Sequence, residues 1–254
     1  YLPGRRVEVA MQPNGLLWAQ LDHWALSWMN TYVNGNPVTE RAGYQVETNA
    51  LWFQSILFAA TMERRYSPSD SAFLKEWSHI LDLVRTNFQN TFWNDYVDNA
   101  GQHLEVRPNM LYALVGEDIP VEPEVAQRVL QVIDNELVTR RGIRTLSPRH
   151  AEYRGVYEGS QTDRDLAYYN GCCLTSLLGP YCEVCFKMKG PAFLNKAQWL
   201  VNGFYEDLNK HGVGAFSELY DGDPPHEPHG AISSALSTAA LLEVEYLKDK
   251  YKEE

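Results

Sequence analysis

Apolar residues recur at helical spacing in segment after segment of this 254-residue chain. In one segment, Val46, Ala50, Phe53, Leu57 and Ala60 follow one another at intervals of three or four positions, which places them on one face of an α-helix. The same spacing predicts helices over residues 46–60, 73–88, 110–114, 125–137, 168–188, 194–208 and 232–246. Because no convincing run of alternating apolar and polar residues occurs, the sequence predicts an all-α fold.

Three long connections separate the predicted helices, at residues 30–45, 139–167 and 212–230. Connections of more than about 15 residues inside a compact domain are usually functional. Their composition is not low-complexity, and nothing in the chain has the character of a flexible linker. We therefore expect a single domain over residues 1–254, with its functional site carried by the loops.

Charge and hydropathy argue against several classes of partner. The formal net charge is −11, so an acidic surface is expected to repel nucleic acid and anionic membranes. The sequence has no run of about 18 apolar residues that could span a bilayer, and no secretory leader opens it. We therefore expect a cytoplasmic protein and leave its oligomeric state open. Because Tyr1 is not a natural start, we also expect the sequence to begin inside a longer polypeptide.

The four cysteines all lie in one short stretch, at Cys172, Cys173, Cys182 and Cys185. Such clustering does not suit a secreted disulfide framework. The C-x-x-C spacing of Cys182 and Cys185 is compatible with zinc or redox chemistry, but the surrounding apolar run favours buried structural thiols. The sequence also shows no metal-ligand spacing and no glycine loop for phosphate, so we expect no cofactor.

The long loops are rich in acidic, amide and aromatic side chains, as in residues 26–30, 160–165 and 215–223. Glycoside hydrolysis needs two carboxyl groups beside the scissile bond, one as acid and one as base or nucleophile. Loops gathered at one end of a helical fold could bring such groups together. The alternative interpretation is ordinary solvated turns, since Asp-Gly is a common turn pair.

Short motifs follow one another along nearly the whole chain. They are residues 14–19 (NGLLWA), 28–30 (WMN), 37–43 (PVTERAG), 45–53 (QVETNALWF), 107–109 (RPN), 142–147 (GIRTLS), 153–159 (YRGVYEG), 164–168 (RDLAY) and 217–223 (SELYDGD). In this order they resemble the amylo-α-1,6-glucosidase domain of glycogen debranching enzymes. The resemblance implies an (α/α)6 toroid of twelve helices. Because fewer are predicted here, it also implies that the first helices are absent from this sequence.

The resemblance further implies inverting hydrolysis of α-1,6-glucosidic linkages in branched α-glucan, with a carbohydrate as the partner. The general base of the family corresponds to Glu218. The general acid is an Asp at the position of Asn30, and an amide has no proton to give a leaving group at neutral pH. The expected pair of catalytic positions is therefore Glu218 and Asn30.

Eight further positions are expected to face the sugar. They are Trp18, Trp28, Glu47, Asn49, Arg107, Asp165, Tyr169 and Asp221. For the two tryptophans, filling the core is the alternative to stacking on a pyranose ring. Glu47 could instead suit the positive end of a helix dipole, and Arg107 and Asp165 could form a structural ion pair.

Two stretches depart from the family pattern. Residues 169–176 replace the usual HQGTVWPW, and residues 234–240 replace QAWSVAE, so one His, three Trp and one Glu are lost. With Asn30, these departures leave a second function open, a catalytically impaired carbohydrate-binding or structural homologue. A scaffold whose acidic surface meets a partner chain is a third hypothesis.

Overall fold

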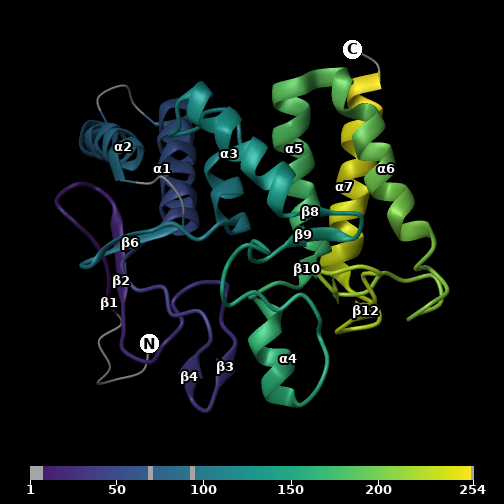
Figure 1. The fold of residues 1–254 in the computed structure, drawn as a ribbon. Coiled ribbons are helices and arrows are strands. Elements are labelled where there is room, and N and C mark those ends of the chain that lie inside the picture. Colours follow the sequence, from purple (N-terminus) through teal and green to yellow (C-terminus); the bar gives the residue numbers. More distant parts are fainter. Residues whose placement is uncertain (1–7, 68–70, 92–94, 253–254) are drawn as a thin grey trace. The chain divides into compact units, whose positions relative to one another are not determined.

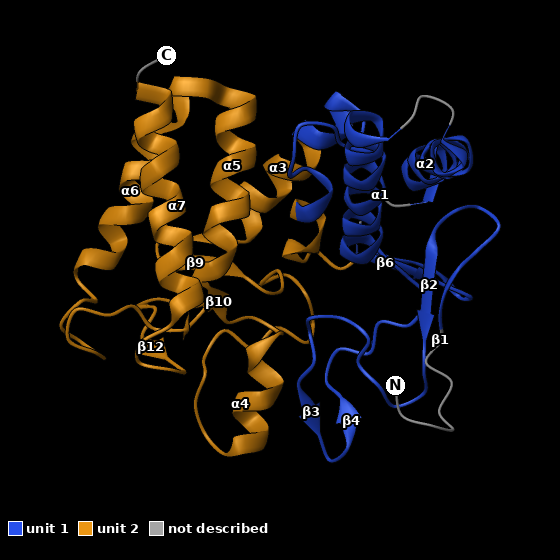
Figure 2. Ribbon diagram, turned by 180° about the vertical axis from the view of Figure 1, so that it is seen from behind, with its two compact units in different colours: residues 1–104, 112–127 blue, residues 105–111, 128–254 orange. Residues whose placement is uncertain are grey.

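A computed structural model describes residues 8–67, 71–91 and 95–252 (Figure 1). The chain divides into two compact units (Figure 2). Unit 1 comprises residues 1–104 and 112–127, and unit 2 comprises residues 105–111 and 128–254. The 3-10 helix η1 (Pro108–Ala113) and helix α3 (Pro123–Glu136) contain residues of both units. None of the described helices combines the length and the apolar character needed to cross a membrane.

Unit 1 is built on the helices α1 (Val46–Tyr66) and α2 (Ala72–Thr91), which pack together. Most of the apolar positions that predicted these helices are buried, including Phe53 and Ala60 in α1 and Val84 and Phe88 in α2. Burying one large apolar side chain contributes about 1.5–3 kcal/mol. The helical spacing therefore marks the face on which unit 1 forms its core.

Short antiparallel strands complete unit 1. Strands β1 (Glu8–Met11) and β2 (Leu17–Gln20) form one hairpin, and β3 (Tyr32–Val33) and β4 (Asn36–Pro37) form another. Strands β5 (Tyr44–Gln45), β6 (Tyr96–Asp98) and β7 (Gly101–His103) form a three-stranded sheet. The β3–β4 hairpin turns at Asn34 and Gly35, both with positive φ, as the favoured Asn-Gly turn requires.

Unit 2 contains a group of three packed helices, α5 (Leu178–Lys189), α6 (Leu194–Tyr205) and α7 (Ala235–Lys252), with the 3-10 helix η3 (Gly190–Phe193) joining α5 to α6 (Figure 1). Helix α5 is buried on most of its surface. It approaches α7 closely at Gly179, where a Cβ atom would lie 2.1 Å from the Glu243 carboxylate. All four cysteines are free and buried in this unit.

A five-stranded antiparallel sheet lies at one end of these helices (Figure 1). Its order is β12-β11-β10-β9-β8, and its strands are two or three residues long. They are β8 (Val138–Thr139), β9 (Gly142–Arg144), β10 (Cys173–Leu174), β11 (Leu219–Tyr220) and β12 (Pro228–His229). The short helix α4 (Gln161–Tyr168) precedes β10, and the 3-10 helix η2 (Thr175–Leu177) follows it.

The prediction of an all-α (α/α)6 toroid is wrong for the residues that the structure describes, because four separate sheets accompany the helices. The sequence did not predict these strands, because most are two or three residues long, too short to show an alternating pattern. The helix predicted over residues 168–188 is wrong in its first half, since only residues 178–188 lie in α5. The chain leaves α4 at Tyr168 and turns at Gly171, which adopts a φ of +154° and at which a Cβ atom would lie 2.4 Å from the Arg154 carbonyl oxygen.

Candidate active site

Glu218 lies directly before strand β11, between two fully buried neighbours, Ser217 and Leu219. The Ser217 hydroxyl is 2.9 Å from His211 Nδ1, and the Ser217 carbonyl accepts a 2.8 Å hydrogen bond from the Ser237 hydroxyl of α7. On the other side, Leu219 pairs with His229 in the sheet. The backbone at Glu218 is therefore held on both sides.

The Glu218 carboxylate accepts one hydrogen bond at each oxygen. The Tyr168 hydroxyl donates to Oε1 at 2.6 Å, and the Ala231 N–H donates to Oε2 at 2.9 Å. The backbone N–H of Glu218 in turn donates to the Ala231 carbonyl at 3.0 Å. The side chain is half-buried, and among the described residues no cation pairs with it. Glu218 is thus a solvent-accessible carboxylate held by neutral donors.

Gly230 has no side chain, and this leaves room for the Glu218 carboxylate. A Cβ atom at position 230 would stand 2.7 Å from Glu218 Oε2 and 3.0 Å from Glu218 Cβ. Gly230 also has a φ of +72°, which side chains rarely adopt. A glycine is therefore required here both by the backbone conformation and by the position of Glu218.

Tyr168 is the last residue of α4, and that helix is anchored at its first turn. The Ser160 hydroxyl accepts from the Asp163 N–H, and the Asp163 carboxylate accepts from the Ser160 N–H, which is a capping box. The Tyr168 ring packs edge-on against Tyr169 and Tyr157, with centroid separations of 4.7 and 6.3 Å. Burial, and then the hydrogen bond to Glu218, raise the pKa of Tyr168 well above its ordinary value. Its hydroxyl therefore remains a donor at neutral pH.

Asp221 holds the loop that carries Tyr157. Its Oδ1 accepts a 2.7 Å hydrogen bond from the Tyr157 N–H. His229 Nε2 lies 3.0 Å from the same oxygen, close enough for an ion pair if the ring is protonated, but not aligned as a hydrogen bond. Asp221 is 6% exposed. Through Tyr157 it is linked to Tyr168, and both of these contacts of Asp221 are with the protein's own groups.

The other positions predicted in unit 2 fall into two groups. Arg107 is buried and donates to the carbonyls of Thr145 and Tyr169 and to Asn170 Oδ1, which indicates a structural role. Tyr169 is also buried, beside Tyr168. Asp165 is half-buried on α4 and accepts a hydrogen bond from Gln161 Nε2 at 2.7 Å.

In unit 1, Glu47 belongs to a closed ionic cluster. Arg41 donates through both terminal nitrogens to Glu47 and through Nε to Asp95 at 2.7 Å, and all three side chains are almost fully buried. Burial alone would lower the pKa of Arg41, but the charges of Asp95 and Glu47 outweigh it and raise that pKa. The cluster therefore stabilises the fold around the start of α1.

The remaining predicted residues of unit 1 differ in exposure. Asn49 is fully buried and bonds to both backbone groups of Leu17 and to the Gln45 carbonyl. Trp18 is half-buried and packs edge-on against Tyr44 at 4.9 Å. Trp28 is half-buried and Asn30 is exposed. Asn30 thus lies in unit 1, whereas Glu218 lies in unit 2.

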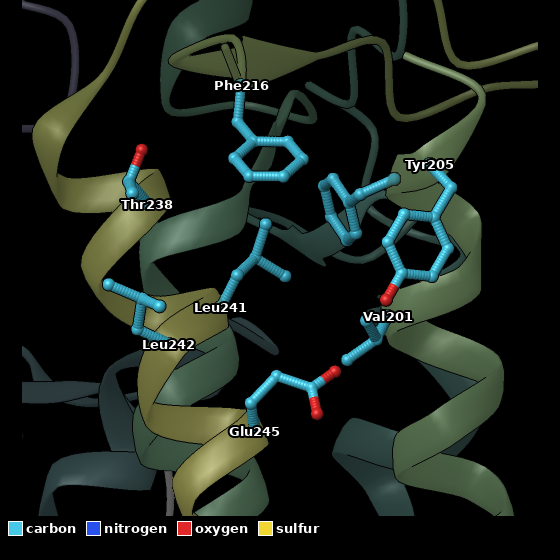
Figure 3. Close-up of a pocket in the computed structure, with 8 residues that line it drawn as sticks. Val201, Tyr205, Phe216, Thr238, Leu241, Leu242 and Glu245 are labelled. Carbon is cyan, nitrogen blue, oxygen red and sulfur yellow. The ribbon is translucent and has the colours of Figure 1, made fainter. Parts of the chain in front are cut away.

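A cavity of about 170 Å³ opens elsewhere in unit 2, between α6 and α7. Figure 3 shows Phe216, Leu241 and Val201 facing it, with Glu245 at one end. Its lining is largely apolar, and its one carboxylate, Glu245, is paired with Lys248 at 2.7 Å. A glycosidase needs two carboxyl groups at the bond it breaks. We therefore place the candidate site at Glu218 and not in this cavity.

Three contributors to the site were not predicted as functional: Tyr168, Gly230 and Ala231. Tyr168 ends the motif over residues 164–168, so that motif was the available signal, but no role was attached to the tyrosine. Nothing in the local sequence connects residues 230 and 231 with a carboxylate 12 or more positions earlier. Only the pairing of β11 with β12 does so.

Comparison with known proteins identifies the family of this chain. A family model described as amylo-alpha-1,6-glucosidase matches residues 1–243, nearly the whole chain. No curated protein matches this chain. Within residues 8–67, 71–91 and 95–252, no group of three or more His, Cys, Asp or Glu side chains is arranged to hold a metal ion. The family implies a glycoside hydrolase-like function on a carbohydrate substrate. The chain belongs to the amylo-alpha-1,6-glucosidase family.

Proposed function

We propose that this protein hydrolyses α-1,6-glucosidic linkages of branched α-glucan by inversion, with Glu218 as the general base. The observation that carries the proposal is the state of the Glu218 carboxylate. It is accessible to solvent, oriented by two neutral donors, and paired with no described cation. A base must be ionised and must keep a free lone pair for the proton that it receives.

In this mechanism a water molecule gives a proton to Glu218 as its oxygen attacks the anomeric carbon. The glycosidic C–O bond breaks on the opposite side, and the departing oxygen takes a proton from a general acid. A carboxylate has about four acceptor positions. Tyr168 and Ala231 occupy one on each oxygen, so acceptor positions remain for the attacking water.

We assign the position of the general acid to Asn30, on the strength of the motif over residues 28–30. An asparagine side chain cannot protonate a leaving group. A positioned general acid contributes about 10²–10⁴-fold to the rate. Hydrolysis of a substrate with a poor leaving group, such as the sugar alkoxide of isomaltose, should therefore be slow. A fluoride leaving group needs no proton and should be much less affected.

The test compares α-glucosyl fluoride with isomaltose, by fluoride release and glucose release. We expect the protein to turn over the fluoride far better than isomaltose, and Glu218→Gln to lower that turnover by about 10²–10⁴-fold. We expect Asn30→Asp to raise isomaltose hydrolysis much more than fluoride hydrolysis. If Glu218→Gln leaves fluoride release intact, Glu218 is not the base. If Asn30→Asp changes both rates equally or neither, position 30 is not the acid position.

Asn30 also favours a second function, a carbohydrate-binding homologue that has lost catalysis. Calorimetric titration with isomaltose and malto-oligosaccharides separates the two. Binding without turnover of either substrate would favour the binding function. A scaffold whose acidic surface meets a partner chain would bind no sugar at all.

A further inference from the structure

The Tyr168 side chain donates a hydrogen bond directly to the Glu218 carboxylate. Its hydroxyl lies 2.6 Å from Oε1, within the 2.5–2.7 Å range typical of an O–H donor on an ionised acceptor. The two residues are 50 positions apart in the sequence, so the contact is made by the tertiary fold and not by a local turn. Tyr168 therefore has a specific partner, the carboxylate of the proposed general base.

The Tyr168 hydroxyl completes a two-sided hold on the carboxylate. The Ala231 N–H, two residues after the end of strand β12, holds Oε2, and Gly230 leaves room for that oxygen. Without Tyr168, Oε1 would lose its donor, and the carboxyl group could rotate about its last side-chain bond. Terminal torsions of this kind are broad and weakly restrained.

Tyr168 itself is well anchored. Its ring contacts those of Tyr157 and Tyr169, and its helix is capped by the Ser160–Asp163 capping box. A residue that orients a catalytic group must be more rigid than the group it orients. Tyr168 meets this requirement through ring packing, and its hydroxyl donates to Glu218 Oε1.

We propose that Tyr168 is the positioning residue of the general base, holding the Glu218 carboxylate at the angle from which it takes a proton from water. This inference rests on the proposed function of Glu218. Tyr168 does not touch the reacting atoms. It acts on the rate through Glu218 alone, and the ring contributes to packing separately from the hydroxyl.

The first measurement is steady-state hydrolysis of α-glucosyl fluoride by Tyr168→Phe, which removes the hydroxyl and keeps the ring. We expect kcat to fall about 10- to 100-fold, as for loss of a hydrogen bond to a charged group, with KM unchanged. Tyr181→Phe is the matched control. It removes another tyrosine O–H to carboxylate bond in unit 2, that to Asp134 on α3, and should leave kcat unchanged. Thermal unfolding of both variants shows whether the fold is retained.

The second measurement isolates the path through Glu218. In Glu218→Ala, added azide can displace fluoride from the anomeric carbon directly. The C–N bond forms as the C–F bond breaks, fluoride leaves with the electron pair, and no base is needed. We expect Tyr168→Phe to have no further effect on this azide-dependent rate. An equal loss in the presence and absence of Glu218 would show that Tyr168 acts on substrate or fold instead, and would overturn the proposal.

The two hypotheses fail in different ways. If Glu218→Ala leaves fluoride release intact without azide, the proposed function fails and Tyr168 has no base to position. If Glu218→Ala abolishes release but Tyr168→Phe matches the native protein in kcat, Glu218 remains the base and only the role of Tyr168 is wrong.

Discussion

Glu47 and Glu218 both come from motifs of the same family, but their surroundings differ in charge and in exposure. Glu47, in unit 1, is 3% exposed and pairs with Arg41, which also pairs with Asp95. Glu218, in unit 2, is half-buried and is held by a tyrosine hydroxyl and a backbone N–H. One carboxylate is paired with a cation, and the other is held by neutral donors.

This difference separates a structural acid from one suited to catalysis. A buried carboxylate in contact with a guanidinium gains Coulomb energy only while it stays ionised and in place, so it is a poor proton acceptor. Neutral donors fix the orientation of a carboxylate without cancelling its charge. We infer that exposure and the charge of the partners distinguish a carboxylate suited to catalysis from a structural one better than membership of a motif does.

The largest expected effect is on stability, from Arg41→Met. Removing the guanidinium leaves Glu47 and Asp95 as buried carboxylates without their cation, which should cost about 3–5 kcal/mol in the free energy of unfolding. Urea unfolding measures it. Arg140→Met, at the exposed pair with Glu206, is the control and should cost at most about 1 kcal/mol. Equal losses in the two variants would show that the buried cluster has no special structural role.

A matched pair of substitutions tests the comparison directly. Glu47→Gln should destabilise by about 1–3 kcal/mol, because one of the two oxygens that accept from Arg41 becomes an NH2 group, which cannot accept. Glu218→Gln should be less destabilising, because the amide oxygen can still accept from the Ala231 N–H while the Tyr168 hydroxyl rotates to accept from the new NH2 group, but turnover should fall. Unfolding curves and fluoride release on both variants decide this. If Glu218→Gln is the more destabilising of the two, the distinction between a structural Glu47 and a catalytic Glu218 is wrong.

Gly230→Ala should affect both properties. Forcing a side chain into a positive φ costs roughly 1–2 kcal/mol, and the new Cβ atom would also displace Glu218 Oε2. Gly35→Ala is a suitable control, because Gly35 has a similar φ of +80° with no atom within 4 Å of the added carbon. We expect similar losses of stability, with turnover reduced only in Gly230→Ala. Unchanged turnover there would argue that the position of Glu218 is not critical.

The smallest expected effect concerns the four buried thiols of unit 2. Burial raises the pKa of Cys173 and of Cys185 to about 12, and it raises those of Cys172 and Cys182 as well. Because the thiolate is the reactive form, the folded protein should react very slowly with a thiol reagent at pH 7. Denaturation should expose all four. Rapid labelling of the native protein would contradict this.

Helical periodicity predicted most of the long helices well. Residues 46–60, 73–88, 125–137 and 194–208 fall within or largely overlap α1, α2, α3 and α6. It failed over residues 168–188, where Gly171 and a two-residue strand interrupt the apolar run. The apolar residues there are buried on several sides, so the pattern that normally distinguishes a helix from a buried strand was absent.

The site was predicted only in part. Motif order supplied Glu218 and the family, and the family is confirmed by the match over residues 1–243. The motifs did not distinguish Glu47 and Asn49, which are buried among the protein's own groups, from the accessible Glu218. They also gave no role to Tyr168. The roles of all these positions toward substrate stay predictions.

What the sequence determined by itself is local, namely the helices whose apolar faces repeat every three or four residues and the short motifs that mark the family. Only the tertiary structure decided which charges are neutralised and which strands pair. Arg41 meets Asp95 across 54 positions, and Tyr168 meets Glu218 across 50. A helix is visible in one sequence because its hydrogen bonds join residues four apart. An ion pair or a two-residue strand joins distant segments, so it becomes visible only when the chain has folded.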